Sequence, residues 1–230
     1  MTPAYGLLTI AGIVISAIVW RSLPHARSIP PLIFVGGLIG AVLGAKLGYI
    51  FCELPFHFGR PDFWWNLFIG RTVLGGLFGG YLGVELAKRF LGHAQPTGDS
   101  FAICVPLGLA IGRIGCYLSG CCQGSPCRPA WYSVVDSSGV SRYPSALAEA
   151  VFQGMIFLVL LILLRVGALR NQLFHVYLMA YALFRIAHEF IRDTPRVAWV
   201  RPYQFLAAFL FIFAFIRFAQ RAHARNVRLV

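Results

Sequence analysis

The chain has 230 residues, of which 58% are hydrophobic and 12% are charged, and its mean hydropathy is +0.72. This composition is too apolar for a soluble globular protein and indicates an all-α polytopic membrane protein. The formal net charge of +12 points to anionic lipid rather than nucleic acid, because the sequence holds no soluble basic domain that would carry a duplex. We therefore expect a single integral membrane domain over residues 1–230 and no nucleic-acid partner.

About seven apolar segments are long enough to cross a bilayer core of about 30 Å, which takes roughly 20 helical residues. In chain order we predict transmembrane helices at 4–20, 31–52, 67–90, 101–119, 145–164, 173–191 and 202–218. The first segment has no basic stretch before it and no small-residue cleavage site, so we interpret it as a retained helix rather than a signal peptide. The longest connections, 53–66 and 123–144, are expected to be loops at the outer face.

Seven spans put the two termini on opposite sides, and the basic residues of short loops select the orientation. One side carries Arg21, Arg27, Lys88, Arg89, Arg165, Arg170, Arg217, Arg221, Arg225 and Arg228. The other side carries Arg60, Arg71, Arg128, Arg142, Arg192, Arg196 and Arg201. Because the richer side is usually cytoplasmic, we expect the N-terminus outside and the C-terminus in the cytoplasm. The outer arginines either bind anionic headgroups or anchor the protein at the interface.

Two glycine series indicate how helices pack. Glycines recur every four residues along segment 31–52, at Gly36, Gly40, Gly44 and Gly48, and along segment 67–90, at Gly75, Gly79 and Gly83. Small residues at this spacing let two membrane helices approach closely. We predict tight packing of these helices, with a crevice for an acyl chain as the alternative.

Polar residues inside the spans suggest a binding site. Tyr181, Arg185 and Glu189 are spaced by four residues, which places them on one face of a helix. We hypothesise that Glu189 orients Arg185 and that Arg185 binds a phosphate, because a guanidinium offers a bidentate fork to phosphate oxygens. A structural ion pair between the two is the alternative. Lys46 and Tyr49 are similar candidates in the second span.

Segment 112–124 sets an arginine and three cysteines at the end of an otherwise apolar stretch: Arg113, Cys116, Cys121 and Cys122. An unpaired guanidinium in hydrocarbon costs several kcal/mol or more. Arg113 must therefore pair, reach the headgroup region or hold an anionic ligand. A lipid-handling site is the first hypothesis for this segment.

An ordered set of motifs resembles the bacterial prolipoprotein diacylglyceryl transferases over nearly the whole chain. The motifs are Gly44-Ala45-Lys46-Leu47-Gly48-Tyr49, Leu74-Gly75-Gly76-Leu77-Phe78-Gly79, Gly112-Arg113-Ile114-Gly115 with the loop to Gly124, Arg142-Tyr143-Pro144-Ser145-Ala146-Leu147-Ala148-Glu149 and Phe184-Arg185-Ile186-Ala187-His188-Glu189-Phe190. Each motif alone is weak evidence, whereas the set in this order is fairly specific.

The resemblance implies a seven-helix enzyme of the bacterial inner membrane, and we expect no cofactor and no metal. Such an enzyme moves the diacylglyceryl group of phosphatidylglycerol to the thiol of a lipobox cysteine, and glycerol phosphate leaves. By resemblance, Arg113 and Arg185 hold the headgroup phosphate and stabilise the charge on the leaving group, with Glu189 orienting Arg185. The expected substrate-binding residues are Tyr49, Lys46, Tyr181, Gly124, Arg142 and Ser145.

Four positions depart from the family pattern. Leu74 stands where the family has a histidine to which activation of the incoming thiol is attributed. Cys116 replaces an asparagine, Cys121 an acidic residue and Tyr143 a histidine. The group that removes the proton in this chain therefore cannot be assigned from the family by position.

The cysteines of segment 112–124 are candidate catalytic residues. A thiolate is favoured beside an arginine, and it can attack a glyceryl carbon or an acyl ester, so Cys116, Cys121 or Cys122 is a candidate carrier of the transferred group. Disulfides that brace the outer loop, with Cys127 as a fourth member, are one alternative. Zinc is another, although the spacing Cys-x4-Cys-Cys-x4-Cys lacks the usual Cys-x2-Cys pair.

Three classes of function follow. We favour a membrane transferase that takes phosphatidylglycerol or another anionic phospholipid as donor and a lipobox-containing prolipoprotein as acceptor. A related transferase with a cysteine nucleophile and a different acceptor is the second class. The third is a non-catalytic lipid-binding relative, which would have less need of Arg113, Arg185 and Glu189.

Overall fold

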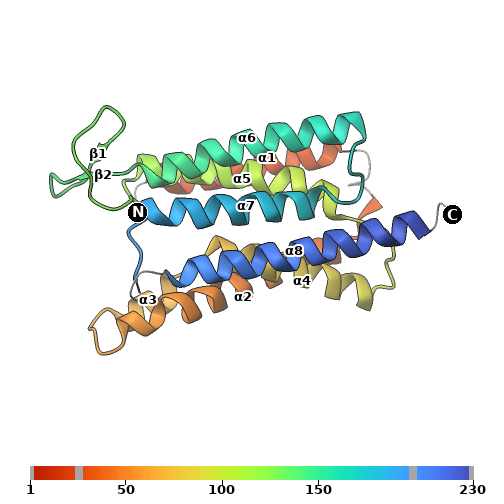
Figure 1. Ribbon diagram of the computed structural model, residues 1–230, viewed down its shortest axis with the longest axis horizontal. Coiled ribbons are helices and arrows are strands. Elements are labelled where there is room, and N and C mark those ends of the chain that lie inside the picture. The colour runs from red at the N-terminus through yellow and green to blue at the C-terminus, as the bar shows by residue number, and fades with distance from the viewer. Residues whose placement is uncertain (1–2, 24–27, 197–200, 228–230) are drawn as a thin grey trace. The chain divides into compact units, whose positions relative to one another are not determined.

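The computed structural model describes residues 3–23, 28–196 and 201–227, and most of the chain in these ranges is helical (Figure 1). The α-helices are α1 (Pro3–Ser22), α2 (Pro31–Cys52), α3 (Phe63–Ile69), α4 (Val73–Phe90), α5 (Gly98–Leu118), α6 (Ser145–Val166), α7 (Leu173–His188) and α8 (Pro202–Val227). The chain also forms the 3-10 helices η2 (Leu54–His57) and η3 (Glu189–Ile191), and the short antiparallel strands β1 (Val134–Val135) and β2 (Ser141–Arg142).

The described helices confirm an all-α polytopic membrane fold. By length and composition, α1, α2, α5, α6 and α8 are each able to cross a membrane. Helices α3 and α4 provide a sixth span if the pair counts as one. Helix α7 has 16 residues, and η3 continues it to Ile191. Helix α8 runs beyond its predicted end at residue 218.

The prediction of one continuous helix over 67–90 is wrong. The segment is divided into α3 and α4, which meet at an angle of 45°. Gly70 lies so close to Tyr49 of α2 that a Cβ would overlap the tyrosine ring. Thr72 is extended, with φ −124° and ψ 138°, and its N–H donates to the carbonyl of Ala45 at 3.0 Å. Contacts with α2 therefore hold the break.

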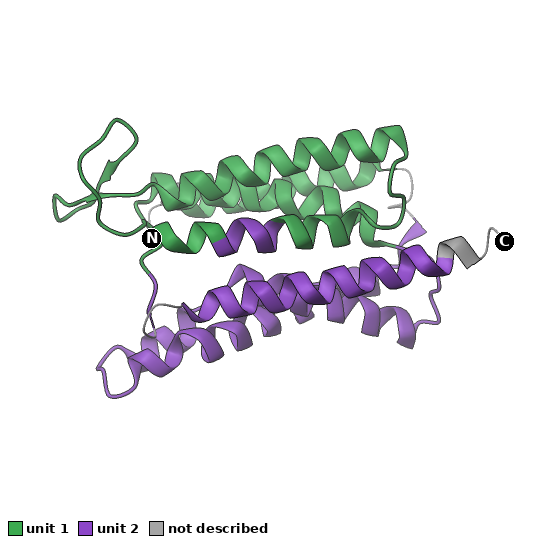
Figure 2. Cartoon of the chain, in the orientation of Figure 1, with its two compact units in different colours: residues 1–27, 97–180, 187–193 green, residues 28–96, 181–186, 194–230 purple. Residues whose placement is uncertain are grey.

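Contacts within the chain define two compact units, which Figure 2 colours separately. Unit 1 comprises residues 1–27, 97–180 and 187–193. Unit 2 comprises residues 28–96, 181–186 and 194–230. Helix α7 contributes residues to both units, and each unit is described below by itself.

In unit 2, α2 packs along α4 through their glycines. A Cβ on Gly40 would overlap the carbonyl of Gly79, and a Cβ on Gly44 would overlap the carbonyl of Gly75. The missing side chains let the two backbones touch. The predicted tight packing is confirmed, and backbone atoms fill the space that an acyl-chain crevice would need at these positions.

In unit 1, α5 contacts both α1 and α6. Ser16 of α1 donates its hydroxyl to the carbonyl of Cys104 at 3.3 Å, and Cys104 donates its thiol to the carbonyl of Ser16 at 3.5 Å. At the start of α5, the carboxylate of Asp99 accepts the N–H of Asn171 at 2.7 Å and that of Leu173 at 3.1 Å. The beginnings of α5 and α7 therefore lie together, and their far ends reach the site described below.

The two long loops differ in structure. Loop 53–66 holds η2 and the start of α3, whereas loop 123–144 holds β1 and β2. The side chains of Trp64, Trp65 and Trp131 are exposed, as suits aromatic residues at a membrane interface. Of the basic residues that predict the orientation, Arg27 and Arg228 lie outside the described residues.

Candidate functional site

The segment 112–124 ends α5 and then turns back on it. Gly120 follows the helix with a φ of 66°, in the left-handed region that glycine adopts without strain. Its N–H donates to the carbonyl of Tyr117, and the N–H of Cys121 donates to the carbonyl of Cys116, both at 3.1 Å. These are the two hydrogen bonds of a Schellman motif. The motif folds Cys121 and the residue after it against the last turn of α5.

This turn brings three thiols together. The Sγ atoms of Cys116, Cys121 and Cys122 all lie within 4.8 Å of one another. Cys122 has a φ of 57°, and a residue other than glycine in this region stores backbone strain of the kind that clusters at functional sites. All six cysteines of the chain are free thiols, so the disulfides considered for this loop are not observed.

The thiols of the turn differ in acidity. The pKa of Cys122 is lowered to about 5, chiefly by a hydrogen bond with Cys116 and further by the positive charges of Arg113 and Arg192, although burial opposes the change. Burial raises the pKa of Cys121. Of these thiols Cys122 is therefore the one whose thiolate is favoured, and a thiolate is the form that acts as a nucleophile or binds a metal.

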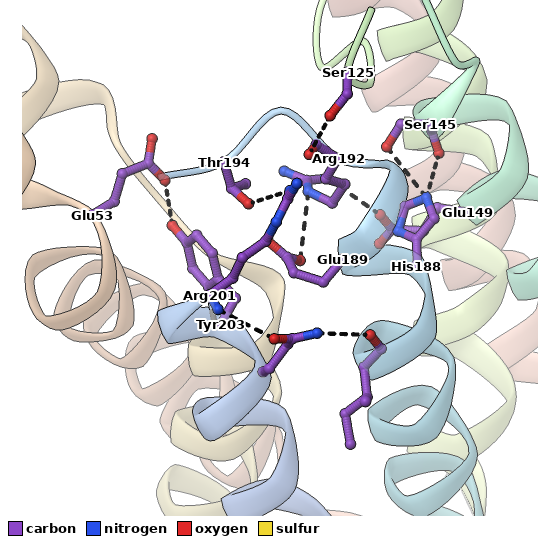
Figure 3. Close-up of polar contacts among 12 residues, drawn as sticks. Glu53, Ser125, Ser145, Glu149, His188, Glu189, Arg192, Thr194, Arg201 and Tyr203 are labelled. Carbon is purple, nitrogen blue, oxygen red and sulfur yellow. Dashed lines mark hydrogen bonds and ion pairs between the residues drawn. The ribbon is translucent and has the colours of Figure 1, made fainter. Parts of the chain in front are cut away.

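A buried carboxylate links two arginines beside this turn. Glu149, one turn into α6, is fully buried, and its Oε2 lies 3.1 Å from Nη2 of Arg113. The same oxygen lies 3.9 Å from Nη1 of Arg192, whose Nε lies 3.9 Å from Oε2 of Glu189. Figure 3 shows Arg192 linked to both carboxylates. The arginine side chains keep 13% and 20% of their surface exposed, so each can still meet a ligand.

His188 and Ser145 join the end of α7 to the start of α6. Nε2 of His188 lies 3.1 Å from the carbonyl oxygen and 3.2 Å from the hydroxyl of Ser145, and Figure 3 shows the ring directed at this residue. A carbonyl oxygen only accepts, so the geometry assigns the proton to Nε2. Both residues are buried, and the contact holds Glu189 and Glu149 at adjacent helix ends.

Arg142, predicted as a substrate-binding residue, joins the loop to the segment after η3. Its Nε donates to Asp136 at 2.6 Å, and its Nη1 donates to Asp193 at 2.9 Å and to the carbonyl of Gly124 at 3.2 Å. The Arg142 guanidinium lowers the pKa of Asp136, and the two carboxylates raise the pKa of Arg142. These bonds give Arg142 a structural task in the loop.

Gly124 lets the loop approach η3 closely. A Cβ at Gly124 would overlap the carbonyl oxygen of Ile191. The N–H of Ser125 donates to that oxygen at 2.8 Å, and the Ser125 hydroxyl donates to the carbonyl of Arg192 at 2.8 Å. The loop therefore fixes the backbone that carries Arg192. This close approach explains why residue 124 is a glycine, and it requires no contact between Gly124 and the substrate.

The other predicted residues belong to unit 2. Lys46 donates its ammonium to the carbonyl of Gly70 at 3.4 Å, and its Nζ lies 6.0 Å from the ring centre of the buried Tyr49. The guanidinium of the buried Arg185 lies 6.0 Å from the ring centre of Tyr203, within the range of a cation–π contact.

The polar stripe of α7 falls in both units. Tyr181 is fully buried and lies with Arg185 in the part of α7 that belongs to unit 2. Glu189 belongs to unit 1, and it begins η3 because α7 ends at His188. The expected regular α-helical spacing from Tyr181 to Glu189 therefore stops one residue before Glu189.

Two charged residues of the site are absent from the predicted set. Glu149 is a carboxylate inside an apolar segment, which is a functional signal in its own right. Arg192 lies three residues after Glu189, the last residue of the predicted polar stripe. The partners of Arg142 carry no comparable signal, because Asp136 and Asp193 meet it only through the fold of the loop.

Comparison with known proteins gives one consistent result. A family model described as prolipoprotein diacylglyceryl transferase matches residues 2–220. A protein of Azospirillum brasilense is 33% identical over 209 residues, covering 82% of this chain and 76% of its own. Proteins of Clostridium tetani (29% identical, 80% of each chain) and Methylococcus capsulatus (30% identical, 82% of this chain and 76% of its own) are also similar. All three are named phosphatidylglycerol–prolipoprotein diacylglyceryl transferase.

Proposed function

Because the chain belongs to the prolipoprotein diacylglyceryl transferase family, we propose that it transfers the diacylglyceryl group of phosphatidylglycerol to a cysteine thiol of a prolipoprotein. The observation that carries this proposal is the family match over residues 2–220. The chain is a multi-pass bacterial membrane protein, as its apolar helices and its relatives show. Its substrates are an anionic phospholipid and a lipoprotein precursor in the same membrane.

The reaction places growing negative charge on a phosphate. The acceptor sulfur forms a bond to the terminal glyceryl carbon, the carbon–oxygen bond to the phosphate breaks, and glycerol phosphate leaves with the electron pair. Guanidinium groups aimed at that phosphate stabilise the transition state. We assign this task to Arg113, whose Nη2 lies 3.1 Å from Oε2 of Glu149 and whose side chain keeps 13% of its surface exposed.

The two buried carboxylates act as positioning residues in this proposal. Glu149 contacts both Arg113 and Arg192, and Glu189 contacts Arg192. Each carboxylate fixes a long side chain that would otherwise sample many rotamers, which lowers the entropy cost of binding phosphate. The same unit holds three cysteines, Cys116, Cys121 and Cys122. We assign them to the binding of the acceptor.

The remaining site residues are proposed on the resemblance. Arg185 is the second phosphate ligand, and its guanidinium lies 6.0 Å from the ring centre of Tyr203. The other proposed contacts to lipid or acceptor are Tyr49, Lys46, Tyr181, Gly124, Arg142 and Ser145. Gly124 approaches the backbone of η3 closely and Arg142 forms ion pairs within the loop, as described above. These contacts support an indirect contribution of both residues to substrate binding.

The proposed setting is the bacterial inner membrane, with the N-terminus outside and the C-terminus cytoplasmic. The excess of basic residues in the short loops of one side supports this orientation. We propose one integral membrane domain in which loops 53–66 and 123–144 lie at the outer face. The exposed tryptophans of these loops support an interfacial position.

The chemistry of sulfur disfavours a covalent carrier of the diacylglyceryl group. Attack by Cys122 on the glyceryl carbon would form a thioether on the enzyme. A thioether has no good leaving group, so the group would not pass on to a second thiol, in contrast to an acyl thioester. A carrier role for Cys122 therefore requires acyl transfer to a different acceptor, which is the alternative function.

The proposed function is tested with phosphatidylglycerol labelled on its glycerol backbone. The purified protein is incubated with this lipid, with and without a lipobox peptide, and the intact masses of protein and peptide are measured. We expect a diacylglyceryl mass on the peptide. An acyl mass retained on the protein would favour the alternative, and transfer to neither would refute the transferase function.

The arginines are tested in the same assay. We expect Arg113→Ala and Arg185→Ala each to abolish transfer while the protein stays folded in detergent. Arg221→Ala is the matched control, because Arg221 pairs with the partly exposed Glu85 at 3.4 Å and has no role in the proposed reaction. Full transfer by both site variants would contradict the phosphate-binding assignment.

A further inference from the structure

The convergence of three thiols arises from a local motif. Cys116 lies in the last turn of α5, and Cys121 and Cys122 lie in the Schellman turn that follows it. Their Sγ atoms lie within 4.8 Å of one another. The two backbone hydrogen bonds of the turn, made by Gly120 and Cys121, hold Cys121 against the last turn of α5. The cluster is therefore a preorganised set of sulfur ligands.

The spacing of the sulfurs suits a thiophilic cation. Zn²⁺ binds thiolates at about 2.3 Å, which puts two sulfurs of a tetrahedral site about 3.8 Å apart. Sulfurs that already lie within 4.8 Å of one another reach this separation by shifts of about 1 Å or less. Side-chain rotation supplies such shifts while the backbone of the turn stays in place.

The surrounding charges also suit such a complex. Three thiolates around a divalent cation carry a net charge of −1. The positive charges of Arg113 and Arg192 act on Cys122, so the complex has compensating charge in its own unit. Soft thiolate ligands favour zinc over magnesium or calcium, which prefer oxygen.

Two of the three cysteines, Cys121 and Cys122, are exposed at the protein surface. A small hollow of about 10 Å³, room for about one water molecule, adjoins Cys121, and Tyr117, Gln123 and Ser145 contribute to its lining. Zinc with three protein ligands and one open position is the arrangement of catalytic rather than structural sites. Because Cys121 and Cys122 are exposed, the fourth position is open to a molecule that approaches from outside the protein.

We propose that Cys116, Cys121 and Cys122 form a tris-thiolate site for zinc, and that the acceptor thiol binds at its open position. The binding of an acceptor thiol at this position rests on the proposed function. The acceptor thiol loses its proton to solvent when it binds the cation, and its sulfur then attacks the glyceryl carbon. The carbon–oxygen bond breaks, glycerol phosphate leaves, and the neutral thioether, a weak ligand, dissociates.

The cysteine spacing in the sequence disfavours zinc, because it lacks a Cys-x2-Cys pair. In the structure the Schellman turn brings Cys121 and Cys122 back to Cys116, so a four-residue gap gives the proximity that a two-residue gap gives in other sites. The turn therefore brings the three ligands together, and Gly120 is the residue in the sequence that indicates this turn.

The test begins with zinc itself. The protein is purified in detergent with a reductant, stripped of metal with a chelator, supplied with zinc and desalted, and bound zinc is measured. Cobalt added in place of zinc reports the ligands by its thiolate charge-transfer absorption. We expect one equivalent of bound metal, thiolate absorption, and a transfer rate that falls about 100-fold after chelation and returns with zinc.

Variants then locate the ligands. Cys116→Ser, Cys121→Ser and Cys122→Ser should each lose bound zinc, whereas Cys127→Ser, in the same loop but outside the cluster, should keep it. Wild-type protein that binds no zinc under reducing conditions, or a triple variant that still binds it, overturns the site whatever the folding of single variants. Full transfer by metal-free protein overturns the acceptor role and leaves the proposed function intact. Zinc binding without transfer by any form supports the site and refutes the proposed function.

Discussion

Glu149→Gln tests the positioning of the two arginines. The substitution keeps the size of the side chain and removes a fully buried charge that lies 3.1 Å from Nη2 of Arg113 and 3.9 Å from Nη1 of Arg192. At an effective dielectric constant of about 20, the closer pair corresponds to ~5 kcal/mol of Coulomb energy. Removing one partner of a buried pair costs about 3–5 kcal/mol, and a chain of this size loses about 2–4 °C in Tm per kcal/mol. We expect Tm to fall by roughly 10 °C.

The effect on transfer should be separable from the loss of stability. A guanidinium displaced by about 1 Å stabilises the leaving phosphate poorly, so we expect kcat to fall about 100-fold at a temperature where the variant is folded. KM for the lipobox peptide should change little. Glu85→Gln is the matched control, because Glu85 also has two basic partners, at 3.3 and 3.4 Å, but keeps 28% of its side chain exposed. Its expected cost is below about 1 kcal/mol, and equal losses in the two variants would refute the reasoning.

Three further predictions concern packing and the loop. Gly44→Ala places a Cβ on the backbone of α4 and should cost about 1–3 kcal/mol in thermal unfolding, whereas Gly154→Ala in α6, which meets nothing within 4 Å, should stabilise the helix by about 0.5–1 kcal/mol. Gly124→Ala pushes the loop away from η3, so we expect faster hydrogen exchange at the backbone of η3 together with slower transfer; unchanged exchange would contradict the close approach. The pKa of Asp136 is lowered by Arg142, so the stability from this pair is present above the ordinary carboxyl pKa and is lost as pH falls through the lowered one. Hydrogen exchange of the loop should rise over that acid range in wild type, and Asp136→Asn should show raised exchange already at neutral pH.

The helical fold follows from the sequence to a large extent, because hydrocarbon forces each spanning segment to satisfy its own backbone hydrogen bonds. The glycine series predicted the α2–α4 contact for a similar reason, since only small residues let membrane helices touch. The break at 70–72 was not predicted. It depends on Tyr49 filling the space beside Gly70 and on Ala45 accepting the N–H of Thr72, and neither contact leaves a trace in local hydropathy.

The candidate site was also predicted only in part from the sequence. The apolar context of Arg113 shows that this guanidinium needs a partner or an anionic ligand, because an uncompensated charge is costly there. Its pairing with Glu149 of another helix required the packing of α5 against α6. The cysteines were visible as a group of thiols beside an arginine, but their convergence within 4.8 Å depends on the turn at Gly120. The local sequence shows whether a residue lies in an apolar or a polar environment. The distances between side chains are set when backbone segments that are far apart in the sequence pack together, so no single segment predicts them.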